Sequence, residues 1–467
     1  MDYPSFESMD FNFRRSFITL WDFPVLILFL ILGFVIFNSI RKKSKGVYGA
    51  RSSVFLSAFL LHCLGSIFIT LIYSYYYKGG DTTAYFNDAR LLHKVFWNNP
   101  VTALDIFFSS SKTLLVNHPY IYNSFRFVAS PDTFMVVKIC FVLQFFSFNL
   151  ILPTALLFGF LSFYASWKFY LIACRFYPHL AKILTIPFFF IPGVHVWGSG
   201  IFKDTISLAL IYFILISIIE LKRTGHTFTL VKFIILIYLL FVIKIYILMT
   251  LLLGFSCYFI AGNLKKVRNV ALKTLAAPAL ITLGVLGFFF SFKYIGDNSK
   301  RGIYSMDQIL ERAEIVSSYL GYVSEKSDGS SYNLGIESFT IPNLASKMPA
   351  AINVTLFRPY FWEVRNPLML AAALESLLIF FFTLYVIYKV GLVNFFSNTI
   401  RSPIIFSMLV YCFSFAFAIG ITSSNFGTLT RYKIPIIPFY VIALILILYS
   451  NRSSRIKSSN GFLKAGL

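Results

Sequence analysis

Residues 25–37 read VLILFLILGFVIF, a run with one glycine and no charged or strongly polar side chain. Similar apolar runs recur along the chain, many of them close to the ~20 residues that a helix needs to cross a bilayer. A strand of a membrane β-barrel alternates apolar and polar residues, and this run does not alternate. Because backbone groups inside lipid must be paired within their own segment, the sequence predicts an all-α, polytopic bundle of transmembrane helices.

The composition agrees with this fold class. Of the 467 residues, 58% are hydrophobic and 13% are charged, and the mean hydropathy is +0.75. Soluble domains carry about 25% charged residues, so the surface of this chain cannot be solvated like theirs. The net charge of +22 does not indicate a nucleic-acid partner, because the cations cluster in short links between apolar runs, as the positive-inside rule describes.

About eleven spans are expected, within a range of 10–13, and residues 1–467 are expected to form a single integral membrane domain. The run 133–148 is interrupted by Lys138 and Gln144 and is not counted. The expected spans lie near residues 19–40, 53–75, 151–174, 183–192, 205–220, 230–262 (a hairpin of two), 274–292, 368–389, 404–421 and 434–449.

The basic links predict the orientation of the chain in the inner (plasma) membrane. The densest of them, RKKSK at residues 41–45, follows the first span and outweighs the Arg14–Arg15 pair that precedes it. The positive-inside rule therefore predicts an external N-terminus and a cytoplasmic, basic tail at residues 451–467.

Two larger loops, residues 76–132 and 293–367, are then expected on the extracytoplasmic side. The first mixes charges of both signs and contains two semi-apolar pieces, 89–96 and 102–115. We expect these pieces to form amphipathic helices on the membrane surface.

The first outward-facing polar motif is KGGDTTAY at residues 78–85, just after the second span. Two glycines before Asp81 allow a tight turn that leaves the carboxylate open to a ligand, with Lys78 and Tyr85 beside it. The alternative is a loop in which a glycine pair simply ends a helix.

The second motif is WGSGIFKD at residues 197–204. Paired charges such as Lys203 and Asp204 beside a Gly-Ser-Gly turn at membrane depth are costly, which indicates a functional use. The alternative is a salt-bridged turn in which Asp204 also caps the next helix.

The third motif, LFRPYFWE at residues 356–363, sets Arg358 and Glu363 among aromatic residues. Arginine binds phosphate through two parallel hydrogen bonds, so Arg358 is a candidate phosphate ligand. The alternative is an interfacial aromatic belt with a surface ion pair.

The fourth motif, TRYKIP at residues 430–435, places Arg431 and Lys433 at the outer mouth of the last span. Cations there run against the positive-inside bias, which favours a specific anionic partner. The alternative is weak anchoring at the membrane surface.

Together these motifs provide one candidate catalytic acid, Asp81, and several cations around an outward cavity. An acid can act as a general base on a hydroxyl or hold a divalent cation such as Mg²⁺ or Mn²⁺, and cations can hold a phosphate or pyrophosphate. That combination suits transfer of a group from a lipid phosphate carrier to a hydroxyl. The six histidines and five cysteines show no metal-binding spacing, and no Walker A, Rossmann or GxSxG motif occurs.

The motifs also resemble segments of known families. The acid in GDTTAY (80–85) resembles the first-loop acid of GT-C glycosyltransferases, which take sugars from polyprenyl-phosphate carriers. SGIFKD (199–204) and RYKIP (431–435) resemble segments of Wzy-like and exopolysaccharide polymerases. The resemblance implies that Asp81 is the catalytic or metal-associated acid and that the cations bind the carrier phosphate. The chain departs from the GT-C pattern, because a lone Asp81 follows the second span where an Asp-Glu pair commonly follows the first.

The sequence thus predicts a membrane glycosyltransferase or polysaccharide polymerase that uses polyprenyl-(pyro)phosphate-linked sugars at the extracytoplasmic face in cell-envelope glycan assembly. Its expected partners are membrane lipids, a lipid-linked sugar donor and a glycan or lipid acceptor. The substrate-binding residues would be Lys78, Tyr85, Lys203, Asp204, Arg358, Glu363, Arg431 and Lys433.

The main alternative is a transporter or flippase for a lipid-linked or anionic substrate, and a further one is a non-catalytic membrane scaffold. Transporters place ionisable groups near the membrane midplane on several helices, whereas most charges here lie at helix ends. Lys244 and Glu375 are the exceptions, and Glu375 is expected to face a neighbouring helix.

Overall fold

The computed structural model describes residues 17–43, 52–264, 306–326 and 331–457. Within these ranges every regular element is a helix, and the β structure is limited to one isolated bridge between Ser331 and Asn425. The all-α membrane bundle predicted from the sequence is therefore confirmed.

Seven helices of the described ranges are long and apolar enough to cross a membrane, or eight if the bent pair α20–α21 is one span. The bent pair comprises α20 (Phe426–Tyr432) and α21 (Ile437–Lys457), which turn by 62° between them. The seven are α1 (Asp22–Lys43), α2 with the π-helical η3 as its end (Phe55–Tyr76), α8 (Ile151–Phe176), α11 (Lys203–Thr224), α12 (Thr227–Leu264), α17 (Pro367–Val390) and α19 (Pro403–Ser423).

The structure shows fewer spans than the eleven expected, and three segments account for the difference. The run after residue 183 forms two short helices, α9 (Thr185–Phe189) and α10 (Pro192–Trp197), because prolines interrupt the helical hydrogen bonding. The predicted hairpin at 230–262 corresponds to α12, which consists of two helices that meet at a kink at Lys244, and the pair is counted as one span among the seven. The expected span at 274–292 lies outside the described residues.

Shorter helices lie between the spans. The first predicted loop folds as α3, α4, α5 and α6, followed by α7, and the second contains α14, α15 and α16. Single turns of 3-10 helix occur at Ser52–Val54, Pro178–Leu180 and Phe361–Glu363. The bounds are α3 (Asp81–Asn98), α4 (Pro100–Phe108), α5 (Ser111–Asn117), α6 (Pro119–Ser124), α7 (Pro131–Phe146), α14 (Met306–Lys326), α15 (Ile341–Ser346), α16 (Met348–Phe357) and α18 (Leu392–Arg401).

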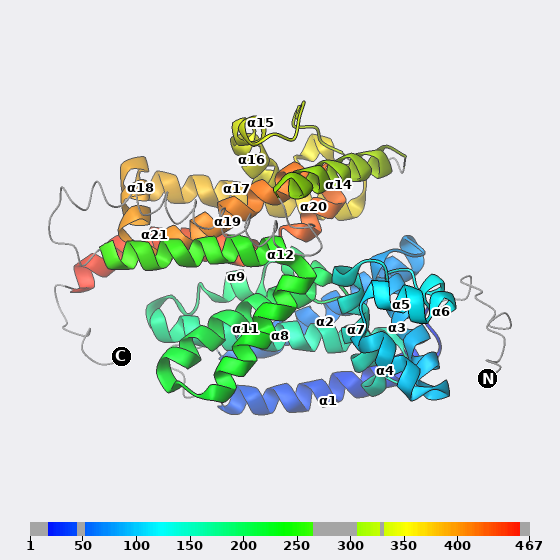
Figure 1. Cartoon of the computed structure of the whole chain (residues 1–467). Coiled ribbons are helices and arrows are strands. Elements are labelled where there is room, and N and C mark those ends of the chain that lie inside the picture. The colour runs from blue at the N-terminus through cyan, green and yellow to red at the C-terminus, as the bar shows by residue number, and fades with distance from the viewer. Residues whose placement is uncertain (1–16, 44–51, 265–305, 327–330, 458–467) are drawn as a thin grey trace.

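The helices run lengthwise, so the molecule has two ends (Figure 1). The start of α1 and the group α3–α6 lie at one end, while α18 and the last turns of α1, α11 and α17 lie at the other. Those last turns carry basic residues, among them Arg41, Lys222 and Lys389. The basic last turns of α1, α11 and α17 thus lie at the end opposite α3–α6.

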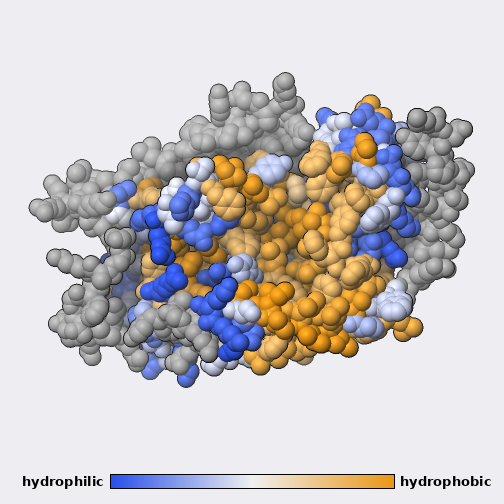
Figure 2. Space-filling model, turned by 90° about the horizontal axis from the view of Figure 1, so that it is seen from below, coloured by the Kyte–Doolittle hydropathy of each residue, from blue (hydrophilic) through white to orange (hydrophobic). Residues whose placement is uncertain are grey.

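The surface agrees with a membrane location. Figure 2 shows one face of the molecule, with hydrophobic residues across its middle and hydrophilic residues toward its ends. On α1, Ile27, Ile31 and Val35 recur at every fourth position and are 58%, 57% and 56% exposed. Such a stripe is suited to contact lipid, because side chains four apart share one face of a helix.

Small residues and buried polar groups fix how the spans pack. Gly65 of α2 lies so close to α10 that a Cβ would be 2.2 Å from the carbonyl oxygen of His195. At the start of α1, the fully buried Asp22 accepts hydrogen bonds from the backbone N–H groups of Thr19 (2.8 Å) and Leu152 (2.9 Å). This carboxylate joins the first turns of α1 and α8.

Gly65→Ala is expected to destabilise the bundle by about 1–3 kcal/mol, because the added methyl group would overlap the backbone of α10. Thermal unfolding in detergent would measure this as a lower Tm. Gly262→Ala in α12 is the matched control, since a Cβ at that position meets no atom within 4 Å. Equal losses in the two variants would contradict the packing argument.

Asp88 on α3 holds the segment that links α6 to α7. Its carboxylate accepts the backbone N–H groups of Arg126 (3.2 Å) and Phe127 (2.9 Å). Burial raises the pKa of Asp88 from its ordinary value of 3.8 to about 6, although these two hydrogen bonds oppose the shift. The folded protein therefore binds a proton more readily than the unfolded chain between these pH values.

The stability of the wild type relative to Asp88→Asn is expected to rise as the pH falls through 6, with the gain complete below pH 4 and amounting to about 3 kcal/mol. Unfolding of both proteins from pH 8 to pH 4 would measure it. Asp105→Asn is the control, because hydrogen bonds from Ser109 and His118 lower the pKa of exposed Asp105. A wild-type advantage that shrinks on acidification would refute the assignment.

Candidate functional site

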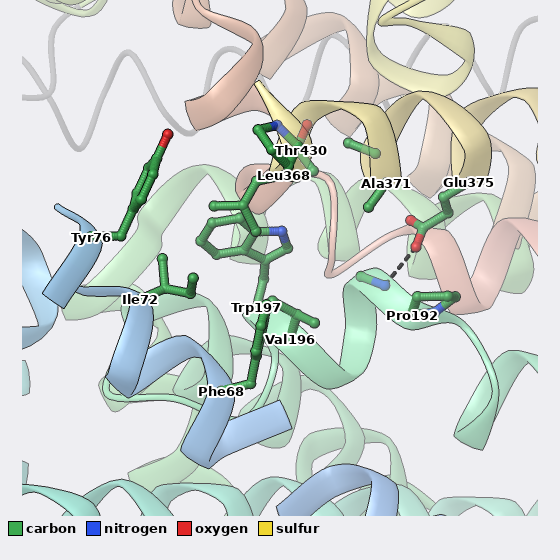
Figure 3. Close-up of a pocket in the computed structure, with 13 residues that line it drawn as sticks. Phe68, Ile72, Tyr76, Pro192, Val196, Trp197, Leu368, Ala371, Glu375 and Thr430 are labelled. Carbon is green, nitrogen blue, oxygen red and sulfur yellow. Dashed lines mark hydrogen bonds between the residues drawn. The ribbon is translucent and has the colours of Figure 1, made fainter. Parts of the chain in front are cut away.

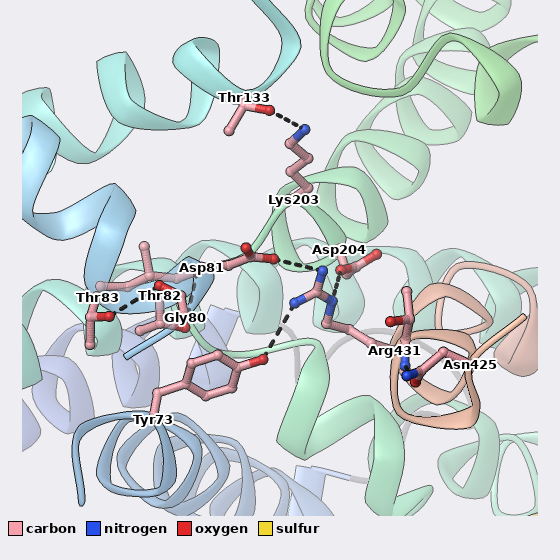
Figure 4. Close-up of polar contacts among 12 residues, drawn as sticks. Tyr73, Gly80, Asp81, Thr82, Thr83, Thr133, Lys203, Asp204, Asn425 and Arg431 are labelled. Carbon is pink, nitrogen blue, oxygen red and sulfur yellow. Dashed lines mark hydrogen bonds and ion pairs between the residues drawn. The ribbon is translucent and has the colours of Figure 1, made fainter. Parts of the chain in front are cut away.

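Three of the four predicted motifs meet where α3, α11 and α20 approach one another. Asp81 begins α3, Asp204 lies in the first turn of α11, and Arg431 lies near the end of α20. The guanidinium of Arg431 lies between the two carboxylates (Figure 4). These residues, with Lys244, are called the Arg431 cluster below.

The glycine turn predicted before Asp81 positions its side chain. Gly79 and Gly80 have φ angles of +155° and +109°, which residues with a Cβ rarely adopt, and Gly80 forms the N-cap of α3. Asp81 Oδ2 lies 2.8 Å from Arg431 Nη2, and the Asp81 side chain is 39% exposed. Asp81 is thus the member of the cluster that a ligand can reach from solvent.

Arg431 is held from several sides. Its Nε lies 3.1 Å from Asp204 Oδ2, and Nη1 donates to the hydroxyl of Tyr73 at 3.4 Å. The guanidinium carbon lies 5.2 Å from the centre of the Phe202 ring. With both acids and a phenol around it, Arg431 has a defined orientation toward Asp81.

Lys244 completes the cluster from the break in α12. Its backbone angles, φ −151° and ψ 82°, are not helical, and its ammonium donates to Asp204 Oδ1. Nζ also lies 4.5 Å from the centre of the Tyr432 ring. The Asp204 side chain is 1% exposed and that of Lys244 is 4%, so each charge depends on its partner.

The sequence analysis did not include Lys244 in the site, although a signal was present. A lysine in the middle of the apolar run 230–262 is costly in a membrane unless it is paired. Its partner Asp204 was a candidate, but the pairing follows from packing between α11 and α12. Asp132 and Arg126, which also lie near the cluster, were not predicted either.

The charges around Asp81 decide its protonation state. Burial alone would raise its pKa, but the Arg431 guanidinium, assisted by the more distant charges of Lys203 and Arg126, holds the pKa below the ordinary value of 3.8. The carboxyl group is therefore ionised at neutral pH.

Lys203 points away from Asp204, toward the start of α7. Its Nζ donates to Asp132 Oδ2 at 2.6 Å and to the hydroxyl of Thr133 at 2.7 Å, and Figure 4 shows the second of these bonds. Neighbouring residues on a helix point in directions about 100° apart, so Lys203 and Asp204 cannot both face Arg431. The Lys203 side chain is 19% exposed.

The third motif forms a separate ion pair close by. Arg358 Nε lies 3.1 Å from both carboxylate oxygens of Glu363. Lys433, which is fully buried, donates to Ser376 Oγ at 2.7 Å and to the carbonyl oxygen of Arg358 at 3.5 Å. Lys433 is thus engaged inside the protein, whereas the Arg358 side chain, which Glu363 engages, is 21% exposed.

The two remaining predicted residues differ in exposure. Tyr85 is 3% exposed, and its ring centre lies 5.0 Å from that of Phe127. Lys78 is exposed at the turn that precedes Asp81. Tyr85 therefore supports the position of α3, whereas Lys78 is accessible to solvent.

An apolar pocket of about 330 Å³ lies beside the cluster, between α2, α10 and α17 (Figure 3). Phe68, Trp197 and Leu368 line it, and so does Thr430, the neighbour of Arg431. Glu375, which also lines it, accepts the backbone N–H of Gly193 at 2.5 Å, so this acid faces a neighbouring helix as predicted.

The residues of the site do not fit a resident Mg²⁺ or Mn²⁺. In the ranges that the structure describes, no group of three or more His, Cys, Asp or Glu side chains could hold a metal ion. Asp81 is paired with Arg431, Asp204 with Arg431 and Lys244, and Asp132 with Lys203. A carboxylate already paired with a cation is a poor ligand for a second one.

Comparison of the chain with protein-family profiles, with curated proteins and with solved structures gave no match. The resemblance to glycosyltransferases and polymerases thus rests on the short motifs, and the site has to be interpreted from its own geometry.

Lys244→Met is expected to destabilise the protein by about 3–5 kcal/mol, because it leaves the second oxygen of buried Asp204 without its cation. The double variant Lys244→Met/Asp204→Asn should recover part of this lost stability, because the buried negative charge is removed and Arg431 still pairs with Asp81. Both would be measured by thermal unfolding in detergent.

Lys232→Met is the matched control on the same helix. Lys232 pairs with Glu220 at 2.6 Å, but the two side chains are 38% and 45% exposed. Such surface pairs contribute about 0–1 kcal/mol, so this variant should unfold close to the wild type. A double variant no more stable than Lys244→Met would argue against the pairing.

Proposed function

We propose that the chain is a multi-pass membrane glycosyltransferase or polysaccharide polymerase that moves a sugar from a polyprenyl-(pyro)phosphate carrier to a hydroxyl group. The observation that carries the proposal is Asp81, an ionised and partly exposed carboxylate at one end of the membrane helices. It is held by Arg431 and influenced by the more distant charges of Lys203 and Arg126, as a site for an anionic donor and a neutral acceptor requires.

We place this site on the extracytoplasmic side of the inner membrane, with the N-terminus outside and the C-terminus in the cytoplasm. The support is the position of the basic last turns of α1, α11 and α17, which lie at the end opposite α3 (Figure 1). Positively charged links are retained in the cytoplasm.

In the proposed reaction the acceptor hydroxyl attacks the anomeric carbon of the donor sugar. The bond between that carbon and the phosphate oxygen breaks, its electron pair remains on the phosphate, and Asp81 takes the hydroxyl proton. Lys203 and Arg126 are the cations best placed to stabilise the departing phosphate, because both act on Asp81 and neither is fully buried.

Donor binding would also prepare Asp81 for this role. In the free protein Arg431 lowers the pKa of Asp81, which makes the carboxylate a weak base. A phosphate that approaches Arg431 would weaken this interaction by adding negative charge, and the pKa of Asp81 would rise. The acid thus becomes a stronger base when the donor is in place.

The apolar pocket supports the choice of a lipid-linked donor. It lies between membrane helices and includes Thr430, next to Arg431. An isoprenoid chain could enter it from the bilayer while its phosphate stays near the cations. Lys433, which is fully buried and donates to Ser376 of α17, would serve to hold α17 and α20 together. Arg358 would stay paired with Glu363.

One observation favours the second candidate, a transporter of a lipid-linked or anionic substrate. Lys244 lies at a break in a long membrane helix, and it pairs with a carboxylate that is 1% exposed. Broken helices and buried ionisable residues commonly mark substrate paths in transporters.

Asp81→Asn is expected to lower kcat for glycan transfer by about 10²–10⁴-fold with little change in donor KM, because the variant loses its proton acceptor. The assay would use liposomes with a polyprenyl-phosphate-linked sugar and a hydroxyl acceptor. Asp105→Asn on α4 is the control, and it should retain wild-type turnover.

Unchanged turnover in Asp81→Asn would show that Asp81 is not the catalytic base. Counterflow of the lipid-linked substrate without any transferred product would favour the transporter.

A further inference from the structure

A second cavity, of about 460 Å³, lies between α14, the segment 331–339 and the end of α19. Cavities of ~300–1,000 Å³ are typical of small-molecule sites. α14 is amphipathic and is not among the helices long and apolar enough to cross a membrane. It is called the α14–α19 pocket below.

The described lining of this pocket is uncharged and combines polar side chains with apolar ones. Its hydroxyl and amide groups include those of Ser317, Ser318, Ser331 and Asn333, and its apolar part is formed by Leu334, Ile336, Phe339 and Ile421. None of the described residues that line it carries a formal charge. Serine and asparagine side chains both donate and accept hydrogen bonds, as the hydroxyl groups of a ligand do.

The pocket is held in shape by contacts between distant parts of the chain. Tyr332 donates its backbone N–H to the carbonyl oxygen of Ser424 (3.2 Å) and its hydroxyl to that of Gly420 (2.8 Å). Ser424 has a φ of +44°, which is uncommon for a residue with a Cβ. This conformation ends α19 and turns the chain into α20.

The pocket is coupled to the candidate active site through α20. Ser331 pairs with Asn425, the N-cap of α20, while Arg431 lies near the other end of that helix. Seven helical residues span ~10 Å, a distance that a short oligosaccharide covers. Tyr332 also packs against Phe426, and the Arg358 guanidinium lies 5.1 Å from the Phe426 ring centre.

We propose that the α14–α19 pocket binds a neutral segment of the acceptor glycan and so presents its terminal hydroxyl to Asp81. The inference rests on the proposed function and names the acceptor as an uncharged, hydroxyl-rich carbohydrate. An anionic glycan would find no cation among the described residues of the pocket walls, and a lipid chain would leave the hydroxyl and amide groups without partners. The ring of Phe339 offers an apolar surface for the C–H face of a sugar.

The test is calorimetric titration of the full-length protein in nanodiscs with four tetrasaccharides. Three are neutral, built from hexose, 6-deoxyhexose or N-acetylhexosamine units, and the fourth is built from uronic acid units. At least one neutral compound should bind and the uronic acid compound should not. Binding of none of the neutral compounds would overturn the proposal.

Gly321→Phe should weaken this binding by at least tenfold, because Gly321 lines the pocket and a Cβ there has ordinary contact distances, the nearest being 3.9 Å from Ser424. Gly262→Phe is the matched control on a helix outside the pocket. Ser318→Ala removes one hydroxyl without adding bulk and should weaken binding by roughly 2- to 10-fold. Unchanged affinity in Gly321→Phe and in Ser318→Ala would overturn the proposal.

Transfer assays keep this inference separate from the proposed function. With a neutral acceptor, Gly321→Phe should raise the acceptor KM and leave kcat and the donor KM unchanged. If glycan binding depends on Gly321 but the protein has no transferase activity, the proposed pocket is supported and the proposed transferase function is refuted. If the protein transfers sugar and Gly321→Phe does not change the acceptor KM, the transferase function is supported and the proposed role of the pocket is refuted.

Discussion

The arrangement of the site depends on one buried carboxylate, Asp204, which pairs with both Arg431 and Lys244. Its side chain is 1% exposed, so its negative charge is stable only with these two cations beside it. The three residues come from α20, α11 and the break in α12, and their pairing ties these elements together. Because Asp204 and Tyr73 orient the guanidinium of Arg431, the same interaction also positions Asp81.

Two pockets of different polarity lie near the Arg431 cluster. The apolar pocket between α2, α10 and α17 includes Thr430, and the α14–α19 pocket lies at the other end of α20. A lipid chain suits the first by its hydropathy, and a neutral glycan suits the second by its hydrogen bonds. The exposed carboxylate of Asp81 is near the Arg431 end of this arrangement, which is why we assign proton transfer to it.

Prediction from the sequence worked best where the physical signal was local. Long apolar runs became α1, α8, α17 and α19, because the cost of unpaired backbone groups in lipid leaves a helix as the only solution. It was less accurate between residues 183 and 197, where prolines divide an apolar run into two short helices. The glycine turn before Asp81 could also be read locally, since Gly80 adopts a positive φ.

By itself the sequence determined a helical membrane chain with a basic end and a set of polar motifs, because hydropathy and charge are properties of single segments. Only the tertiary structure decided which polar groups meet. Tyr73 and Arg431, which form a hydrogen bond, are 358 positions apart. Of two adjacent residues, Lys203 pairs with Asp132 and Asp204 pairs with Arg431. The reason is physical. A buried charge must find an opposite charge, and the packing of α3, α11, α12 and α20 decides which one lies within reach.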